Sequence, residues 1–154
     1  MIGIKFVIKN EYDIILSKIL YDIDCSNFRW KIEDEEVLGE QGKSFFAKTD
    51  YSNNEFQKVV QKEHYPIHLN LQMYYKNSDV NDIKNYDQFL ISSCQLILFI
   101  IDNIFVEIYA KNQTILEKIS KNAVNCNFSN IELINESVAT YKIFSKYCQL
   151  LSKE

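Results

Sequence analysis

The longest apolar run of the chain, CQLILFIIDNIFVEIYAK at residues 94–111, is interrupted near its middle by Asp102 and Asn103. Both residue types tolerate positive φ angles and are common in two-residue hairpin turns. The β-branched and aromatic runs on either side therefore predict two antiparallel strands. A two-residue turn would set Ile101 opposite Ile104, Phe99 opposite Val106 and Ile97 opposite Ile108, with all six side chains on one buried face.

A membrane span is the alternative for this part of the chain, over residues 91–109. Its large apolar residues would favour insertion by about 5 kcal/mol, but Asp102 near the centre costs about 3 kcal/mol and Glu107 a similar amount. Asn103 and Gln95 add to that cost. The pattern therefore predicts core strands and no membrane association.

Shorter patterns predict the other elements. Alternating apolar and polar positions indicate strands, and apolar residues at spacings of three and four indicate amphipathic helices. The expected strands are 3–8, 28–38, 44–48, 67–75 and 128–134. The expected helices are one capped by Asn10 that runs to Ile23, one after Ser52, one at 85–92, one after Thr114, and a last one at 137–152.

Two of these helices carry capping-box signatures, Ser52-x-x-Glu55 and Thr114-x-x-Glu117, in which the hydroxyl and the glutamate satisfy helix amides reciprocally. Helices and strands alternate throughout, and the chain is long enough, at 154 residues, for one hydrophobic core. We therefore expect a single α+β domain over residues 1–154, with a mixed β-sheet, a central 95–110 hairpin and helices packed on the sheet.

Composition narrows the class of protein. The chain is 47% apolar and 25% charged, as in ordinary globular proteins. Its net charge is −4 and Arg29 is its single arginine, which argues against nucleic acid as a partner. The N-terminus lacks a basic start and a continuous apolar stretch, which predicts a cytoplasmic protein. No pattern sets the oligomeric state.

Two long stretches resemble a known family. GIKFVIKNEYDIILSKILYDID with FRWKI, and YDQFLISSCQLILFIIDNIFVEIYAKN further on, resemble a family of small uncharacterised cytoplasmic proteins, a domain of unknown function, from Bacillus-type bacteria. The resemblance spans most of the chain and rests on strand cores and helix faces. It implies a single cytoplasmic domain and carries over no activity and no catalytic residue.

The residue types that perform chemistry form no recognised motif. GEQGKS at 39–44 ends like a phosphate-binding loop, but Val37 stands where that motif needs its first glycine. His64 and His68 are separated by Pro66, and no third metal ligand is evident except the neighbouring Glu63. The four cysteines, Cys25, Cys94, Cys126 and Cys148, show no C-x-x-C pairing. We therefore predict no catalytic residue, no metal and no cofactor.

The sharpest charge feature is an acidic segment, defined here as Glu33, Asp34, Glu35, Glu36 and Glu40. A solvated turn is its simplest interpretation; an acidic surface that docks a basic protein partner is the functional one. The leading hypothesis is a non-enzymatic protein-binding module, of the immunity or inhibitor kind. The alternative is a small enzyme that acts on a soluble metabolite with a cysteine or histidine in a pocket.

Overall fold

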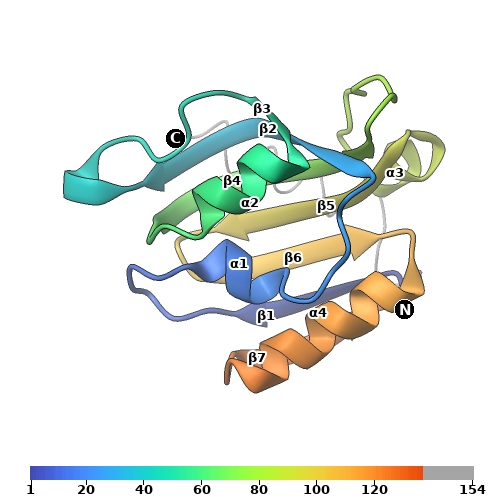
Figure 1. Cartoon of the computed structure of the whole chain (residues 1–154). Helices are drawn as coiled ribbons and strands as arrows, with labels where there is room; N and C mark the ends of the chain where they lie inside the picture. The colour runs from blue at the N-terminus through green and yellow to red at the C-terminus, as the bar shows by residue number, and fades with distance from the viewer. Residues whose placement is uncertain (137–154) are drawn as a thin grey trace.

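The computed structural model describes residues 1–136 and shows one seven-stranded sheet in the order β3-β2-β4-β5-β6-β1-β7 (Figure 1). The strands are β1 (Gly3–Val7), β2 (Phe28–Leu38), β3 (Asp50–Ser52), β4 (Tyr65–Tyr75), β5 (Cys94–Ile101), β6 (Phe105–Ala110) and β7 (Ser129–Ile134). The helices are α1 (Ile15–Ile19), α2 (Asn53–Val60), α3 (Tyr86–Ile91) and α4 (Gln113–Asn125), with a 3₁₀ turn at Glu40–Gly42. The expected helix at 137–152 lies outside the described residues.

The α+β class and the central hairpin are confirmed. Every pairing between the described strands is antiparallel, so the sheet is more uniform than the mixed sheet expected. Sequence order and spatial order differ, because β1 lies between β6 and β7. Within residues 1–136, no helix has the length and apolar content that crossing a bilayer requires.

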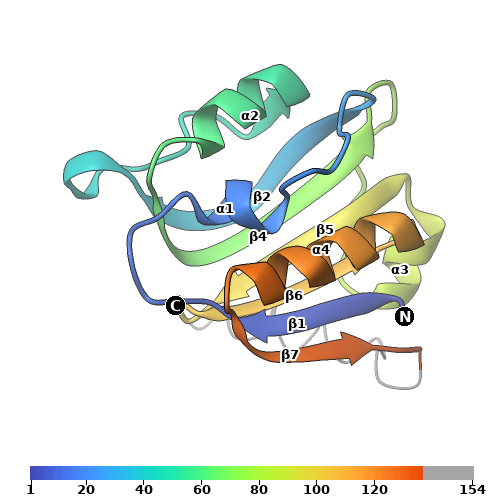
Figure 2. The same cartoon turned by 60° about the horizontal axis from the view of Figure 1, so that its bottom comes forward.

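Three helices, α1, α2 and α4, lie on the same face of the sheet (Figures 1 and 2). We call it the helix face. The main core fills the space between these helices and the sheet. Its largest fully buried side chains include Trp30, Phe56 and Leu71. The indole of Trp30 stacks on the ring of Phe56, with centroids 4.3 Å apart, and joins β2 to α2. This contact fixes the position of α2 over the outer strands.

The opposite side of the sheet, the second face, carries a smaller apolar cluster and a row of buried polar groups. Tyr86 and Phe89 of α3 pack there with Tyr109 of β6. On β4, the Tyr74 hydroxyl donates to Gln72 Oε1 at 2.5 Å, and Gln72 Nε2 donates to Asn70 at 3.3 Å. Burial raises the pKa of Tyr74, so this hydroxyl keeps its proton and its role as a donor.

The hairpin turn is confirmed, but its expected register is wrong by one residue. Asp102 and Asn103 do have positive φ angles, 49° and 71°. Ile101, however, pairs with Phe105 and not with Ile104. The Ile104 carbonyl instead accepts from the Ile8 amide at 2.8 Å, which holds it at the end of β1. The slip exchanges the two sides, because side chains alternate along a strand.

The corrected register gives each side of the hairpin a different environment. The residues that enter the main core are Leu96, Leu98, Ile100, Val106, Ile108 and Ala110. Those on the second face are Ile97, Phe99, Ile101, Phe105, Glu107 and Tyr109. Ile97, Phe99 and Ile101 therefore pair with Tyr109, Glu107 and Phe105. The expected partners were Ile108, Val106 and Ile104.

The first expected helix is also shorter than its pattern suggests. α1 has only five residues, whereas Asn10 accepts a hydrogen bond from the Tyr65 hydroxyl instead of capping a helix. The Asp13 amide donates to the His64 carbonyl at 3.2 Å and the His64 amide to the Asp13 carbonyl at 3.0 Å. This backbone pairing holds residue 13 extended and delays the start of the helix.

The strand expected at 44–48 is wrong as well. Only an isolated bridge joins Ser44 to Leu38, and the strand that pairs with β2 is β3. Phe46 enters the main core beside Tyr51, with ring centroids 5.9 Å apart. Residues 39–49 therefore form a loop that packs by its aromatic side chains and is joined to β2 only by single backbone hydrogen bonds, from the Phe45 amide to Val37 and from the Ile32 amide to Thr49.

One expected capping box is confirmed and the other is displaced. The Ser52 side chain accepts from the Glu55 amide while the Glu55 side chain accepts from the Ser52 amide. At α4 the cap is Asn112, whose Oδ1 accepts from the amides of Thr114 and Ile115 at 2.8 and 3.3 Å. Asparagine caps helices as well as threonine does, so the Thr114 signature was two residues late.

The two candidate caps make different predictions for α4. Asn112→Ala should lower the free energy of unfolding by about 1 kcal/mol, because two helix amides lose their acceptor. Thr114→Ala should change it by less than about 0.5 kcal/mol. Urea denaturation followed by circular dichroism measures both, and a larger effect at Thr114 would contradict the observed cap.

Candidate functional site

The acidic segment begins where β2 is irregular. The register of β2 against β4 shifts between Ile32 and Asp34, which leaves Glu33 as an extra residue in the strand. After the shift, Asp34 and Glu36 lie on the second face beside His68. The distances from the His68 ring nitrogens to these two carboxylates are 3.5 and 4.0 Å.

The other members of the acidic segment lie elsewhere. Glu35 is half-buried, and its carboxylate accepts from the Val37 amide at 2.7 Å. Burial raises the pKa of Glu35. Glu33 and Glu40 are exposed, with Glu40 in the 3₁₀ turn that follows β2. The structure therefore places four of the five carboxylates on the surface and uses the fifth to shape the strand.

The exposed acids occupy an edge of the sheet. β3 is the outermost strand, but it pairs only with Arg29, Trp30 and Lys31 of β2. Beyond them, no described strand pairs with the outer side of residues 33–36. Charged side chains on such an edge discourage pairing between copies, and they leave a docking surface only for a partner of opposite charge.

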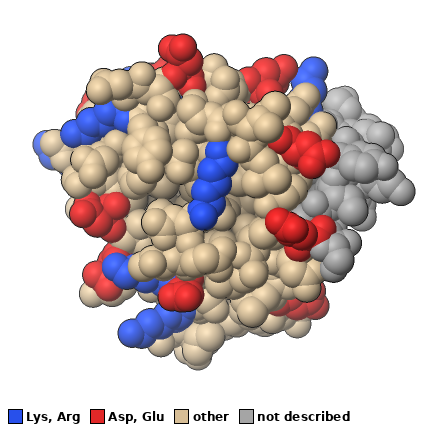
Figure 3. All heavy atoms as spheres, turned by 90° about the vertical axis from the view of Figure 1, so that its right-hand side faces the viewer, with Lys and Arg blue, Asp and Glu red and all other residues tan. Residues whose placement is uncertain are grey.

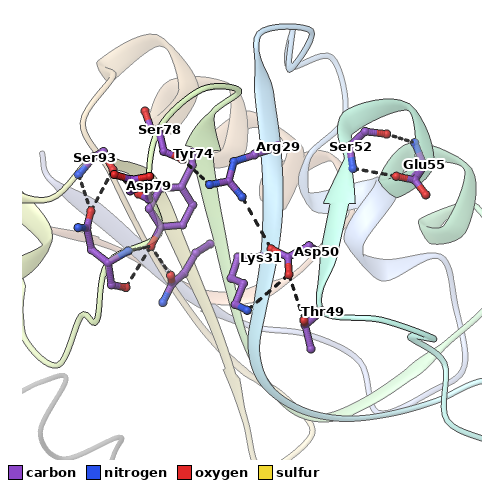
Figure 4. Close-up of polar contacts among 12 residues, drawn as sticks. Arg29, Lys31, Thr49, Asp50, Ser52, Glu55, Tyr74, Ser78, Asp79 and Ser93 are labelled. Carbon is purple, nitrogen blue, oxygen red and sulfur yellow. Dashed lines mark hydrogen bonds and ion pairs between the residues drawn. The ribbon is translucent and has the colours of Figure 1, made fainter.

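The sequence did not reveal a polar network that surrounds Asp50, next to the acidic segment (Figure 4). The Asp50 carboxylate lies 3.7 Å from both Arg29 Nη1 and Lys31 Nζ. The Arg29 guanidinium also donates to the Ser78 carbonyl and lies over the Tyr74 ring, 5.7 Å from its centroid. Arg29 and Lys31, the two cations of β2, are thus both paired with Asp50.

A groove lies between α2 and the loop of residues 39–48, which follows β2. Its volume is about 1000 Å³ and its lining is mainly apolar, through Phe45, Ala47 and Val59 among others. Lys48 and Glu55 form an ion pair across it, and the Lys48 amide donates to the Tyr51 hydroxyl at 3.2 Å. Glu40 belongs to both the groove and the acidic segment. No sequence motif marks this groove, because loop and helix meet only after folding.

Two of the three described cysteines, Cys25 and Cys94, and one of the two histidines, His64, are buried. Burial raises the pKa of Cys25 to about 11 and that of Cys94 to about 12, so both thiols stay protonated and unreactive at neutral pH. His64 is fully buried, which differs from the surface or partly buried histidine that the sequence suggested. His64 and His68 have different surroundings and do not form a pair.

Metal and phosphate chemistry gain no support from the described residues. Among residues 1–136, no group of three or more His, Cys, Asp or Glu side chains is arranged to hold a metal ion. The Gly39–Ser44 stretch forms a tight turn closed by the Gly42 amide on the Gly39 carbonyl at 3.2 Å.

On the side of the molecule near α3, acidic and basic side chains are interspersed and no patch of one sign dominates that view (Figure 3).

Together these features define an α+β protein with one antiparallel sheet, three helices on one face and α3 on the other, and an acidic strand edge beside a groove. The chain belongs to the family described as protein of unknown function (DUF2691), whose model matches residues 1–145. It is 31% identical over 140 residues to the uncharacterized protein YncE of Bacillus subtilis (strain 168). The aligned region covers 87% of this chain and 92% of that protein. No solved structure matches. The expected resemblance to uncharacterised Bacillus proteins is confirmed.

Proposed function

We propose that this protein is a non-enzymatic binding module that docks a basic protein partner through the acidic segment. One observation carries the proposal: Glu33, Asp34 and Glu36 are exposed on a stretch of β2 that extends past its pairing with β3. Carboxylates held on a strand are oriented more firmly than carboxylates on a solvated loop. Such an arrangement steers a partner of opposite charge and speeds association.

The adjacent groove adds an apolar surface that a partner's side chain can bury. Interfaces gain most of their free energy from a few desolvated anchors in pockets, and the groove offers apolar walls beside Glu40. Its four lysines and three glutamates nearly balance, so it adds apolar contact area without a strong field of its own. A partner with basic residues for the strand and one apolar side chain for the groove fits both features, as in immunity or inhibitor complexes.

The competing function is a small enzyme acting on a soluble metabolite. Cys25 and Cys94 hold their protons at neutral pH, and both ring nitrogens of His64 are engaged with backbone groups. These features weigh against catalysis by Cys25, Cys94 or His64. We also propose a cytoplasmic location, supported by the free thiols of Cys25, Cys94 and Cys126.

The docking surface is tested by a charge-reversal pair, Glu33→Lys with Glu36→Lys. Glu35 is left unchanged because its bond to the Val37 amide supports the strand. The control is Glu11→Lys with Glu117→Lys, two other exposed residues, which alters the net charge equally. Affinity capture from a lysate of the source organism, with each tagged form, should recover a basic partner with the native and control proteins and lose it with the acidic-segment variant.

The kinetics of the captured partner give the quantitative test. Reversal at Glu33 and Glu36 should slow association at least about tenfold at low salt, and the difference should shrink at high ionic strength. The control pair should have a much smaller effect. Equal association rates for all three proteins would contradict docking through the acidic segment.

A further inference from the structure

His64 lies at a junction between three segments that are distant in the sequence. Its Nδ1 donates to the Lys62 carbonyl at 2.8 Å, and its Nε2 accepts from the Leu16 amide at 3.2 Å. An Nε2 that accepts a hydrogen bond carries no proton, so the ring is neutral with its proton on Nδ1. On its flat side the ring packs on Phe45, with centroids 4.5 Å apart.

The bond to Leu16 matters because α1 lacks another cap. Leu16 is the second residue of α1, and Ile14, at the capping position, provides no side-chain acceptor. His64, the residue just before β4, therefore satisfies an amide at the start of α1. Phe45 is a wall shared by the histidine ring and the groove, so a displacement of the ring would reach the groove directly.

We propose that His64 is an acid-sensitive latch that fastens the start of α1 and the Phe45 wall of the groove to β4, and that protonation of its Nε2 releases both. A proton on Nε2 would face the Leu16 amide hydrogen, so two donors would meet without an acceptor. The resulting imidazolium would also be fully buried. A buried charge without a partner is more costly than the loss of one hydrogen bond.

The direction of the pH dependence follows from burial. Burial lowers the pKa of His64 below its ordinary value of 6.5. The unfastened state, in which the ring reaches water, takes up a proton more readily than the fastened state. The latch is therefore complete above about pH 6.5 and weakens as the pH falls from there toward the lowered pKa, by up to tenfold per pH unit.

The charged residues on the segments around His64 do not remove this dependence. Asp13, whose backbone pairs with His64, favours the protonated ring, but its carboxylate is engaged by Lys18 and by the Ile14 amide. Lys62 and Glu63 precede His64 in the chain and are exposed, as is Lys43 on the loop of Phe45. The nearest carboxylate is thus already shared with a lysine.

Amide hydrogen exchange between pH 7.5 and 5, corrected for the intrinsic rate, tests the latch. In the native protein the amides of residues 15–19 and of the Phe45 loop should lose protection as the pH falls, while those of β5 keep theirs. His64→Gln should remove the dependence, because its amide can accept from Leu16 but does not titrate in this range. His68→Gln is the matched control and should behave like the native protein.

Two results would overturn the proposal. One is native protection at 15–19 that is constant over this pH range; the other is an equal loss of protection in β5, which would make His64 a determinant of global stability and not a local latch. If His64→Gln fails to fold, NMR of the native protein decides. The Leu16 amide shift should titrate with the same midpoint as the His64 imidazole, and a Leu16 shift that does not follow it contradicts the latch.

Discussion

Phe56→Ala should lower the free energy of unfolding by about 3–5 kcal/mol, the larger of the two greatest effects expected for this protein. Phe56 is fully buried and stacks on Trp30 at an interplanar angle of 14°. It also contacts Tyr51 edge-on, with centroids 6.5 Å apart. Truncation would leave a cavity between α2 and the outer strands that the stacked indole is too rigid to fill.

Trp30 is the single tryptophan of the chain, so its fluorescence reports directly on this packing during urea unfolding. The matched control is Phe105→Ala, the same change at a hairpin residue that is 48% exposed, which should cost less than about 1 kcal/mol. Comparable losses at the two positions would mean that the stack of Trp30 on Phe56 is not a main anchor of α2.

The patterns that were correct in the sequence are those set by neighbours in the chain. The Ser52 and Glu55 capping box, the Asp102 and Asn103 turn and the alternation of β4 all depend on residues within a few positions of one another. Local backbone preferences and side-chain periodicity determine such features. For this reason the α+β class followed from the sequence.

Most of the features that were wrong are set by distant residues; the cap of α4, which lies at Asn112 and not at Thr114, is a local exception. The hairpin register depends on the bond between Ile8 and the Ile104 carbonyl, and the start of α1 depends on His64. The hydrophobic periodicity near Ile104 or Asn10 cannot indicate that Ile8 or His64 lies close by in the fold. Similarly, Ser44–Lys48 has the composition of a strand, but its phenylalanines find better burial in the main core.

The candidate site also has one part that the sequence predicted and other parts that only the folded chain reveals. The acidic segment was visible as a run of charges, but the irregularity at Glu33 decides which carboxylates share a surface with His68. The groove needs the loop, β3 and α2 together, so no local signal marks it. Binding by the acidic segment remains a prediction, and the structure sharpens it by showing which glutamates can be changed without disturbing the strand.

Asn122→Asp should lower the free energy of unfolding by about 3 kcal/mol or more at neutral pH. The Asn122 side chain is 6% exposed, and its Nδ2 donates to the carbonyls of Ile19 and Tyr21 at 2.9 and 2.8 Å. These two bonds join α4 to the end of α1. Aspartate has the same shape, but its ionised oxygens would face two carbonyl oxygens in a buried site.

The effect should depend on pH in a direction that identifies its cause. Burial and the facing carbonyls would raise the pKa of the new carboxyl group, because the protonated form can still donate one hydrogen bond. The variant should therefore be least impaired near pH 4, and its deficit should grow as the pH rises through that raised pKa. Urea titrations of the native and variant proteins between pH 4 and 8 measure the difference.

Asn125→Asp provides the control, since Asn125 is exposed on the same helix. An added charge at the end of α4 should cost only a few tenths of a kcal/mol. A deficit for Asn122→Asp that stays constant from pH 4 to 8 would mean that lost packing, and not an unsatisfied charge, weakens the contact. The junction of α1 and α4 would then depend on shape alone, whereas a rising deficit would show that the two donated hydrogen bonds hold these helices together.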